Sequence, residues 1–105
     1  MVDLALSRRW FPELAAKMRK VGLAVKVSVR PEAHGRPNLV VEVTGARSMG
    51  VFEAWESGEA DYTVFHAPSR SSEILHAQRG LALTDANFKN TFMRFAIEMR
   101  RAERR

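Results

Sequence analysis

The chain of 105 residues is long enough for one domain with its own hydrophobic core, and we expect a single domain over residues 1–105. It contains no cysteine, which excludes disulfides, thiolate metal sites and cysteine nucleophiles and is typical of a reducing compartment. The formal net charge of +5 favours anionic partners without indicating a fold. Neither a signal-peptide pattern nor a run of about 18 apolar residues is present, so we expect a cytoplasmic protein that does not enter a membrane.

The charges are segregated along the sequence. Residues 94–105 hold five arginines against two glutamates, whereas residues 47–62 hold one arginine against four carboxylates. We therefore expect a basic C-terminal end and an acidic centre, so the overall sign does not describe every surface.

The first element is predicted to be a helix over residues 4–20. Four apolar side chains recur at the i, i+3, i+4 and i+7 spacing of one helical face, and they are Phe11, Leu14, Ala15 and Met18. Gly22 supplies a C-terminal stop. Pro12 leaves two alternatives open, because an interior proline kinks a helix and a first-turn proline is tolerated. Either the helix is kinked, or its regular part begins only near Phe11.

An antiparallel meander is predicted next, and its first strand, residues 23–30, alternates apolar and polar side chains. The further strands are predicted over residues 38–44, 48–56, 60–66 and, more weakly, 71–78, with a loop at 31–37 and a turn at 67–70. The third strand is apolar on both faces, as is typical of a central strand. Pairing His66 with Ser72 would put Tyr62 opposite His76 as a cross-strand packing pair.

The last element is predicted to be an amphipathic helix with Leu83 as hydrophobic staple and Thr84 as N-cap. Its apolar stripe consists of Phe88, Phe92, Phe95 and Met99. The arginine-rich end, Arg100 to Arg105, is expected to fray. Together these elements predict an α+β fold: a single antiparallel four- or five-stranded meander sheet, flanked by an N-terminal and a C-terminal helix packed on one face.

Four carboxylates gather around a predicted turn at Gly58, and they are Glu53, Glu56, Glu59 and Asp61. Glu53 and Asp61 are expected to lie near each other across the hairpin, as a general acid and base would need to. Because hairpin tips are solvated, we interpret the group as an exposed charged loop, with or without a partner, rather than as a catalytic site. Trp55 either packs in the core or points outward beside Glu53 as an interface anchor.

No pattern in the sequence predicts an enzyme. His34, His66 and His76 lack the spacing of a metal site, and neither a nucleophile elbow nor a phosphate-binding loop occurs. We therefore expect no catalytic residue, no metal and no cofactor. The basic residues of the first helix and of the C-terminal end allow a different interpretation, a nucleic-acid-associated domain, although no nucleic-acid-binding motif is present.

The segment Trp55-Glu56-Ser57-Gly58, followed by Asp61, resembles the TriTu-type bacterial immunity proteins. The aromatic pair in the first helix, the strand after Gly22 and the amphipathic C-terminal helix resemble that family in the same order, so the similarity spans nearly the whole chain. The resemblance implies a cytoplasmic bacterial antidote without enzymatic activity, which binds a cognate toxin domain and occludes or distorts its active site. It assigns no ligand residues.

From the clustering of charge we hypothesise that the toxin is contacted by Glu53, Trp55, Glu56, Glu59 and Asp61. The alternatives are a basic nucleic-acid-associated domain and a secretion chaperone for an effector. The chemistry of the toxin and any homo-oligomeric state are left open by the sequence.

Overall fold

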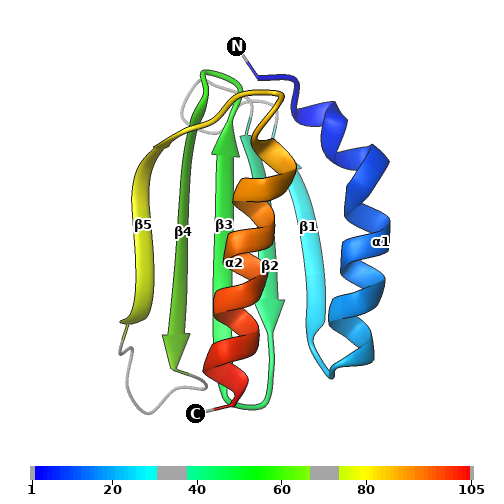
Figure 1. Ribbon diagram of the computed structural model, residues 1–105, viewed down its shortest axis with the longest axis vertical. Coiled ribbons are helices and arrows are strands. Elements are labelled where there is room, and N and C mark those ends of the chain that lie inside the picture. The colour runs from blue at the N-terminus through cyan, green and yellow to red at the C-terminus, as the bar shows by residue number, and fades with distance from the viewer. Residues whose placement is uncertain (1, 31–37, 67–73, 105) are drawn as a thin grey trace.

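The computed structural model describes residues 2–30, 38–66 and 74–104. The elements in chain order are a 3-10 helix (Leu4–Leu6), α1 (Ser7–Lys20), β1 (Ala24–Arg30), β2 (Asn38–Thr44), β3 (Ser48–Trp55), β4 (Glu59–His66), β5 (Ile74–Ala82) and α2 (Phe88–Glu103). The five strands form one antiparallel sheet in the order β1-β2-β3-β4-β5. The chain is therefore a simple meander between two helices, as Figure 1 shows.

Both helices lie on the same face of the sheet, with α2 in front of the central strands in Figure 1. α1 packs against α2 through ring contacts, since Trp10 lies 5.1 Å from Phe88 and Phe11 lies 5.6 Å from Phe92 between ring centroids. The predicted fold class, an α+β fold with an antiparallel sheet and a helix from each end of the chain, is confirmed.

The core lies between α2 and the sheet. The predicted stripe of α2, from Phe88 to Met99, is fully buried, and it meets Phe52 at the centre of β3. Gly50 lets the helix approach closely, because a Cβ at this position would lie 2.7 Å from the Phe95 ring and would also meet the sulfur of Met99. The central strand is therefore covered most tightly on its helix side.

α1 begins at Ser7, four residues before Phe11, and Pro12 lies inside it. The alternative that the regular helix begins only near Phe11 is therefore wrong, and Pro12 is an interior proline. Because proline has no N–H, it cannot donate the helical hydrogen bond to the carbonyl of Arg8. The helix ends at Lys20, and the predicted stop, Gly22, follows it with a φ of +89° in the left-handed region.

α2 begins at Phe88, three residues after Asp85, so the predicted N-cap at Thr84 is wrong. Thr84 and Asn87 instead close a turn before the helix: Thr84 N donates to Asn87 Oδ1 at 2.8 Å, and Asn87 N donates to Thr84 Oγ1 at 3.1 Å. The Thr84 side chain, which would suit an N-cap, therefore stabilises the turn that precedes the helix. At the other end α2 continues to Glu103, beyond Arg100, where fraying was expected.

β5 runs from Ile74 to Ala82, so it extends further toward α2 than predicted. Its register pairs His76 with Val64, not with Tyr62. Irregularities between Ala60 and Tyr62 and between Val64 and Phe65 shift the pairing, and sequence alternation cannot reveal such shifts. The loop at residues 31–37, the turn at 67–70, the first residues of the predicted fifth strand and His34 lie outside the described residues.

Candidate partner-binding face of the sheet

Each strand presents alternate side chains to the two faces of the sheet. One set lies on the face that carries the helices, and its members Phe52, Val41 and Val64 are 0% exposed. The other set lies on the face turned away from α1 and α2, which we call the outer face. No helix of the described residues covers this face (Figure 1). It carries Val40, Glu42, Met49, Val51, Glu53, Trp55, Asp61, Thr63 and Phe65.

One end of the outer face is apolar. Met49 pairs with Phe65, and Phe65 pairs with Ile74, so three neighbouring strands place an apolar row side by side. Met49 is 41% exposed and Ile74 is 51% exposed, while Phe65 is half-buried. A contiguous group of large apolar side chains that remains exposed on a folded protein marks a potential interaction surface.

The other end of the outer face carries a pair of carboxylates. Glu53 and Asp61 are register partners on β3 and β4, which confirms the expectation that they lie near each other across the hairpin. Like charges placed directly opposite are destabilising, and each carboxylate accepts a hydrogen bond. Glu53 accepts from Asn38 Nδ2 at 2.7 Å, and Asp61 accepts from the backbone N–H of Gly80 at 2.8 Å.

The carboxylate pair opens into a shallow hollow of about 270 Å³. The hollow is lined by Val51, Glu53, Asp61, Tyr62, Thr63, Phe65 and Arg79. The ring of Tyr62 packs on the opposite side of β4, 5.6 Å from Phe95, so the polar side chains facing the hollow come from the acid pair, Thr63 and Arg79. A partially solvated pair of carboxylates suits a lysine or arginine of a partner protein.

Trp55 lies on the outer face beside Glu53, not among the core residues beneath the helices. The sequence left both positions open, and the structure selects the outward one. The side chain is half-buried. Its Nε1 atom is buried without a hydrogen-bond partner among the described residues. Part of the indole therefore packs on the sheet, and the remainder is accessible at the edge of the acidic pair.

The sequence predicted an exposed charged loop at the tip of the hairpin, and two backbone hydrogen bonds tie this tip to other segments of the chain. Val2 N donates to the carbonyl of Glu56 at 2.8 Å, and Leu83 N donates to the carbonyl of Gly58 at 2.7 Å. Gly58 has the positive φ expected of it, +99°. Glu56 is half-buried, while Glu59 is exposed. Of the five predicted contact residues, Glu53, Trp55 and Asp61 share the outer face, and Glu56 and Glu59 flank the turn.

A second titratable cluster lies on the helix side of the sheet. His76 stacks on Tyr62 with ring centroids 5.7 Å apart, and its Nδ1 lies 3.8 Å from Glu98. Glu98 also accepts from Arg101 Nη1 at 2.8 Å. Burial raises the pKa of Tyr62, the Glu98 carboxylate raises it further, and the Arg94 guanidinium opposes them. The predicted contact between Tyr62 and His76 is present, although the two residues are diagonal neighbours on adjacent strands and not register partners. No sequence pattern indicated that Glu98 would join them, because α2 brings it there only in the folded chain.

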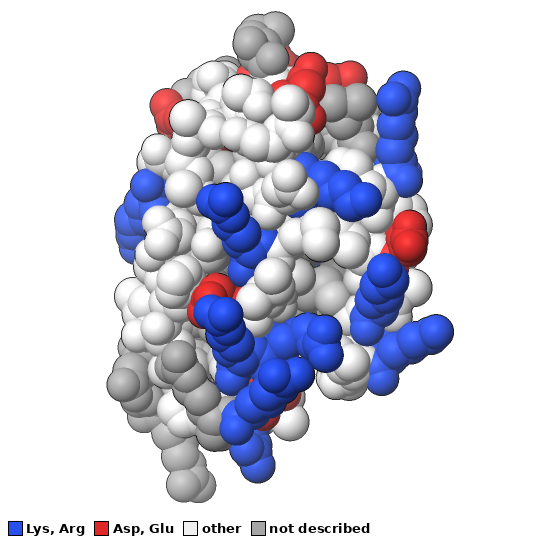
Figure 2. Space-filling view, viewed as in Figure 1, with Lys and Arg blue, Asp and Glu red and all other residues white. Residues whose placement is uncertain are grey.

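The helix layer is basic. α1 carries five Lys and Arg against one Glu, and α2 carries four against two. Figure 2 shows basic side chains distributed over this layer, with a concentration toward the C-terminal end of α2, and acidic ones at the opposite end and between the basic ones. The groove between the two helices is mainly apolar, and its lining includes Leu14, Met18, Met93, Ala96 and Ile97. An apolar strip therefore separates the basic groups of the two helices.

No helix within the described ranges is both long and apolar enough to cross a membrane. Among the described residues, no three His, Asp or Glu side chains gather as metal ligands would. Comparisons of the chain with protein-family models, with curated proteins and with solved structures gave no match.

Proposed function

We propose that this protein is a bacterial immunity protein, which binds a cognate toxin domain through the outer face of its sheet and neutralises it. One observation carries the proposal: the outer face combines a half-buried tryptophan, a carboxylate pair and an apolar row on a surface that neither helix covers. The resemblance of the Trp55-Glu56-Ser57-Gly58 segment to TriTu-type immunity proteins supports the identity of the partner as a toxin. Binding requires no catalytic residue, metal or cofactor from this chain.

The size of the outer face suits such a role. Five strands spaced about 4.8 Å apart and roughly eight residues long make a surface of about 24 by 26 Å, or roughly 600 Å². A standard interface covers about 800 Å² on each partner. The outer face together with the hairpin tip therefore supplies an interface of ordinary size, with an aromatic anchor, apolar contacts and a charged rim.

The charge of the outer face suits a cationic partner. Glu53 and Asp61 lie together in one hollow, Glu56 and Glu59 add carboxylates at the tip, and the basic residues concentrate on the helix layer. Such a separation of charge orients an approaching cationic surface toward the sheet and raises the association rate. The antiparallel sheet also holds these groups in place before binding, which limits the entropy lost in the complex.

The partner can be identified by affinity capture. Tagged protein is incubated with nuclease-treated lysate of its own source cells, washed at rising salt, and the retained proteins are identified by mass spectrometry. The proposal expects a stoichiometric protein with a toxic domain to survive the high-salt wash. Recovery of no such protein, with nucleic acid that elutes steeply with salt, would contradict it.

Trp55→Ala is expected to weaken toxin binding by about thirtyfold, or ~2 kcal/mol, because interface tryptophans are among the residues that dominate binding energy. Isothermal titration calorimetry with the captured toxin domain measures the change. Trp10→Phe, a change in the helix layer, is the matched control and should leave affinity within about twofold. Equal effects of the two variants would show that the toxin does not use the outer face.

Glu53→Gln combined with Asp61→Asn is expected to weaken binding by about tenfold and to flatten its salt dependence. Both amides keep an oxygen that can accept the hydrogen bonds from Asn38 and Gly80, so the change removes charge with little change in shape. Glu13→Gln on α1 removes a carboxylate from the other layer as a control. An unchanged salt dependence in the double variant would exclude the acidic pair from the interface.

A nucleic-acid-associated domain is the second candidate, and the basic helix layer is the observation that favours it. Nucleic acid would be expected to bind this layer with a steep salt dependence, and the outer-face variants would not affect it. A secretion chaperone would bind an effector through the same outer face. It differs from an immunity protein in that the captured partner would be an exported effector that this protein does not inhibit.

A further inference from the structure

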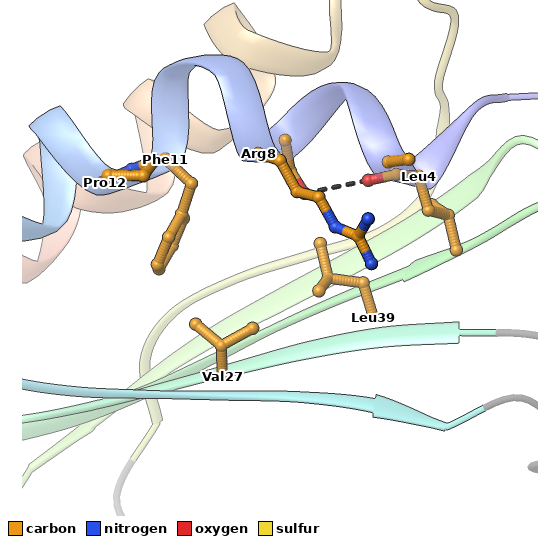
Figure 3. Close-up of a pocket in the computed structure, with 8 residues that line it drawn as sticks. Leu4, Arg8, Phe11, Pro12, Val27 and Leu39 are labelled. Atoms are coloured by element: carbon orange, nitrogen blue, oxygen red, sulfur yellow. Dashed lines mark hydrogen bonds between the residues drawn. The ribbon is translucent and has the colours of Figure 1, made fainter.

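A groove lies between α1 and the sheet, on the helix side and at the edge formed by β1 (Figure 3). Its volume is about 350 Å³, within the range of small-molecule sites. The lining comes from the 3-10 helix, the first half of α1, β1 and β2, and consists of Leu4, Ala5, Ser7, Arg8, Phe11, Pro12, Val27 and Leu39.

The groove exists because α1 does not close onto the middle of β1. Val27 faces the helix side, where its register partner Val41 on β2 is 0% exposed, yet Val27 itself is 42% exposed. A valine on the covered face of a sheet normally loses nearly all of its contact with water. Its exposure leaves apolar surface that an apolar ligand would remove from water at about 25 cal/mol per Å².

The polar groups of the lining are few. The hydroxyl of Ser7 donates to the carbonyl of Leu4 at 2.8 Å, so it is already satisfied inside the fold. Arg8 is the one charged residue among the described residues of the lining. In Figure 3 its guanidinium extends from α1 toward the sheet, beside Leu39. No described carboxylate forms an ion pair with it.

Pro12 adds an independent observation. Its ring lies in the wall of the groove, and its position inside α1 removes the hydrogen bond that residue 12 would donate to the carbonyl of Arg8. An interior proline is costly for a helix, and local costs of this kind concentrate at binding sites. Here the turn that lacks this hydrogen bond is the one that lines the groove.

We propose that the groove binds a medium-chain fatty acid, that is, an unbranched apolar chain ending in a carboxylate. The chain lies against Phe11, Val27 and Leu39, and the carboxylate pairs with the Arg8 guanidinium at the mouth. Within the described residues, an apolar wall with the Arg8 cation, which pairs with no described carboxylate, matches the two parts of such a ligand, because guanidinium binds carboxylate through parallel hydrogen bonds. The site lies on the opposite side of the sheet from the outer face and does not depend on the function proposed above.

The test is calorimetric titration of the full chain with decanoate below its critical micelle concentration, with decanol as the neutral ligand of equal chain length. Decanoate is expected to bind at one site, about tenfold more tightly than decanol. Arg8→Gln should remove that preference, since it deletes the charge that distinguishes the two ligands. Arg9→Gln makes the same change of charge at the next residue, which does not line the groove, and should bind decanoate as the natural chain does.

A second variant tests the apolar wall. Val27→Phe fills the groove from β1 at a position already open to solvent, so it should fold, as circular dichroism can verify, and lose decanoate binding at least tenfold. The proposal is overturned if decanoate fails to bind, if decanol binds equally well, or if Arg8→Gln and Arg9→Gln weaken decanoate equally. Retained affinity in Val27→Phe would also overturn it.

Discussion

Replacing Phe92 by Ala is expected to lower the free energy of unfolding by about 3–5 kcal/mol. The side chain is 0% exposed and joins the two helices to the sheet. Its ring centroid lies 5.2–5.7 Å from those of Trp10, Phe11, Phe52 and Phe95. Truncation leaves a cavity that the four surrounding rings cannot jointly fill, so the lost transfer energy is added to lost packing. Urea denaturation followed by circular dichroism measures the change.

The neighbouring residue provides the control. Met93 is 37% exposed and borders the groove between the helices, so Met93→Ala should cost about 1 kcal/mol or less. Since a domain of this size has a total stability of about 5–15 kcal/mol, the Phe92 variant is expected to lose about a fifth of it or more. Similar losses in both variants would mean that the aromatic cluster does not form the centre of the core.

The fold was largely predictable because the hydrophobic periods along the chain are clear. Residues 23–30 have the two-residue period of a strand, and the stripe from Phe88 to Met99 has the helical one. The predictions failed where the same residues suit two local structures equally well. Thr84 suits an N-cap and a turn equally well, and tertiary packing selected the turn. The register of β5 depends on irregularities that leave no periodic signal.

The candidate site was predictable only in part. The cross-strand neighbours Glu53 and Asp61 follow from the hairpin centred on Gly58, because the turn fixes the register. The orientation of Trp55 did not follow, since β3 is apolar on both faces and periodicity cannot say which face the helices cover. The hollow with Arg79 and the groove beside Arg8 are each lined by segments that are far apart in the sequence, so neither could be predicted from the sequence.

The two helices share the sheet's inner face, and this arrangement explains why the outer face is available. α2 follows the central strands, where Gly50 allows it to approach, and α1 completes the layer through ring contacts with α2. No further described helix remains to cover the other side. Apolar residues on the outer face are therefore either a cost to solubility or a surface for a partner, and their position on the same face as Trp55 favours the partner.

Glu103→Ala is expected to lower the free energy of unfolding by about 3 kcal/mol, because this carboxylate fastens the end of α2 to the turn between β2 and β3. It accepts from the backbone N–H groups of Ala46 and Arg47, each at 3.0 Å, and from Ser48 Oγ at 2.5 Å. Each hydrogen bond to a charged group contributes about 1.5–3 kcal/mol when buried and less when partly exposed. Chemical denaturation measures the loss.

A loss of stability in Glu103→Ala would be informative, since an acidic residue at a helix C-terminus is otherwise unfavourable by about 0.3–1 kcal/mol and its removal alone should stabilise the helix. The three hydrogen bonds outweigh that cost, and Ser48, which is 0% exposed, would lose its acceptor in the variant. Glu103→Gln keeps one oxygen and should lose about half as much. Glu13→Ala, which breaks an exposed pair with Lys17 at 3.6 Å, should change stability by at most about 0.5 kcal/mol. If Glu103→Ala is no more destabilising than Glu13→Ala, the end of α2 is held by packing alone.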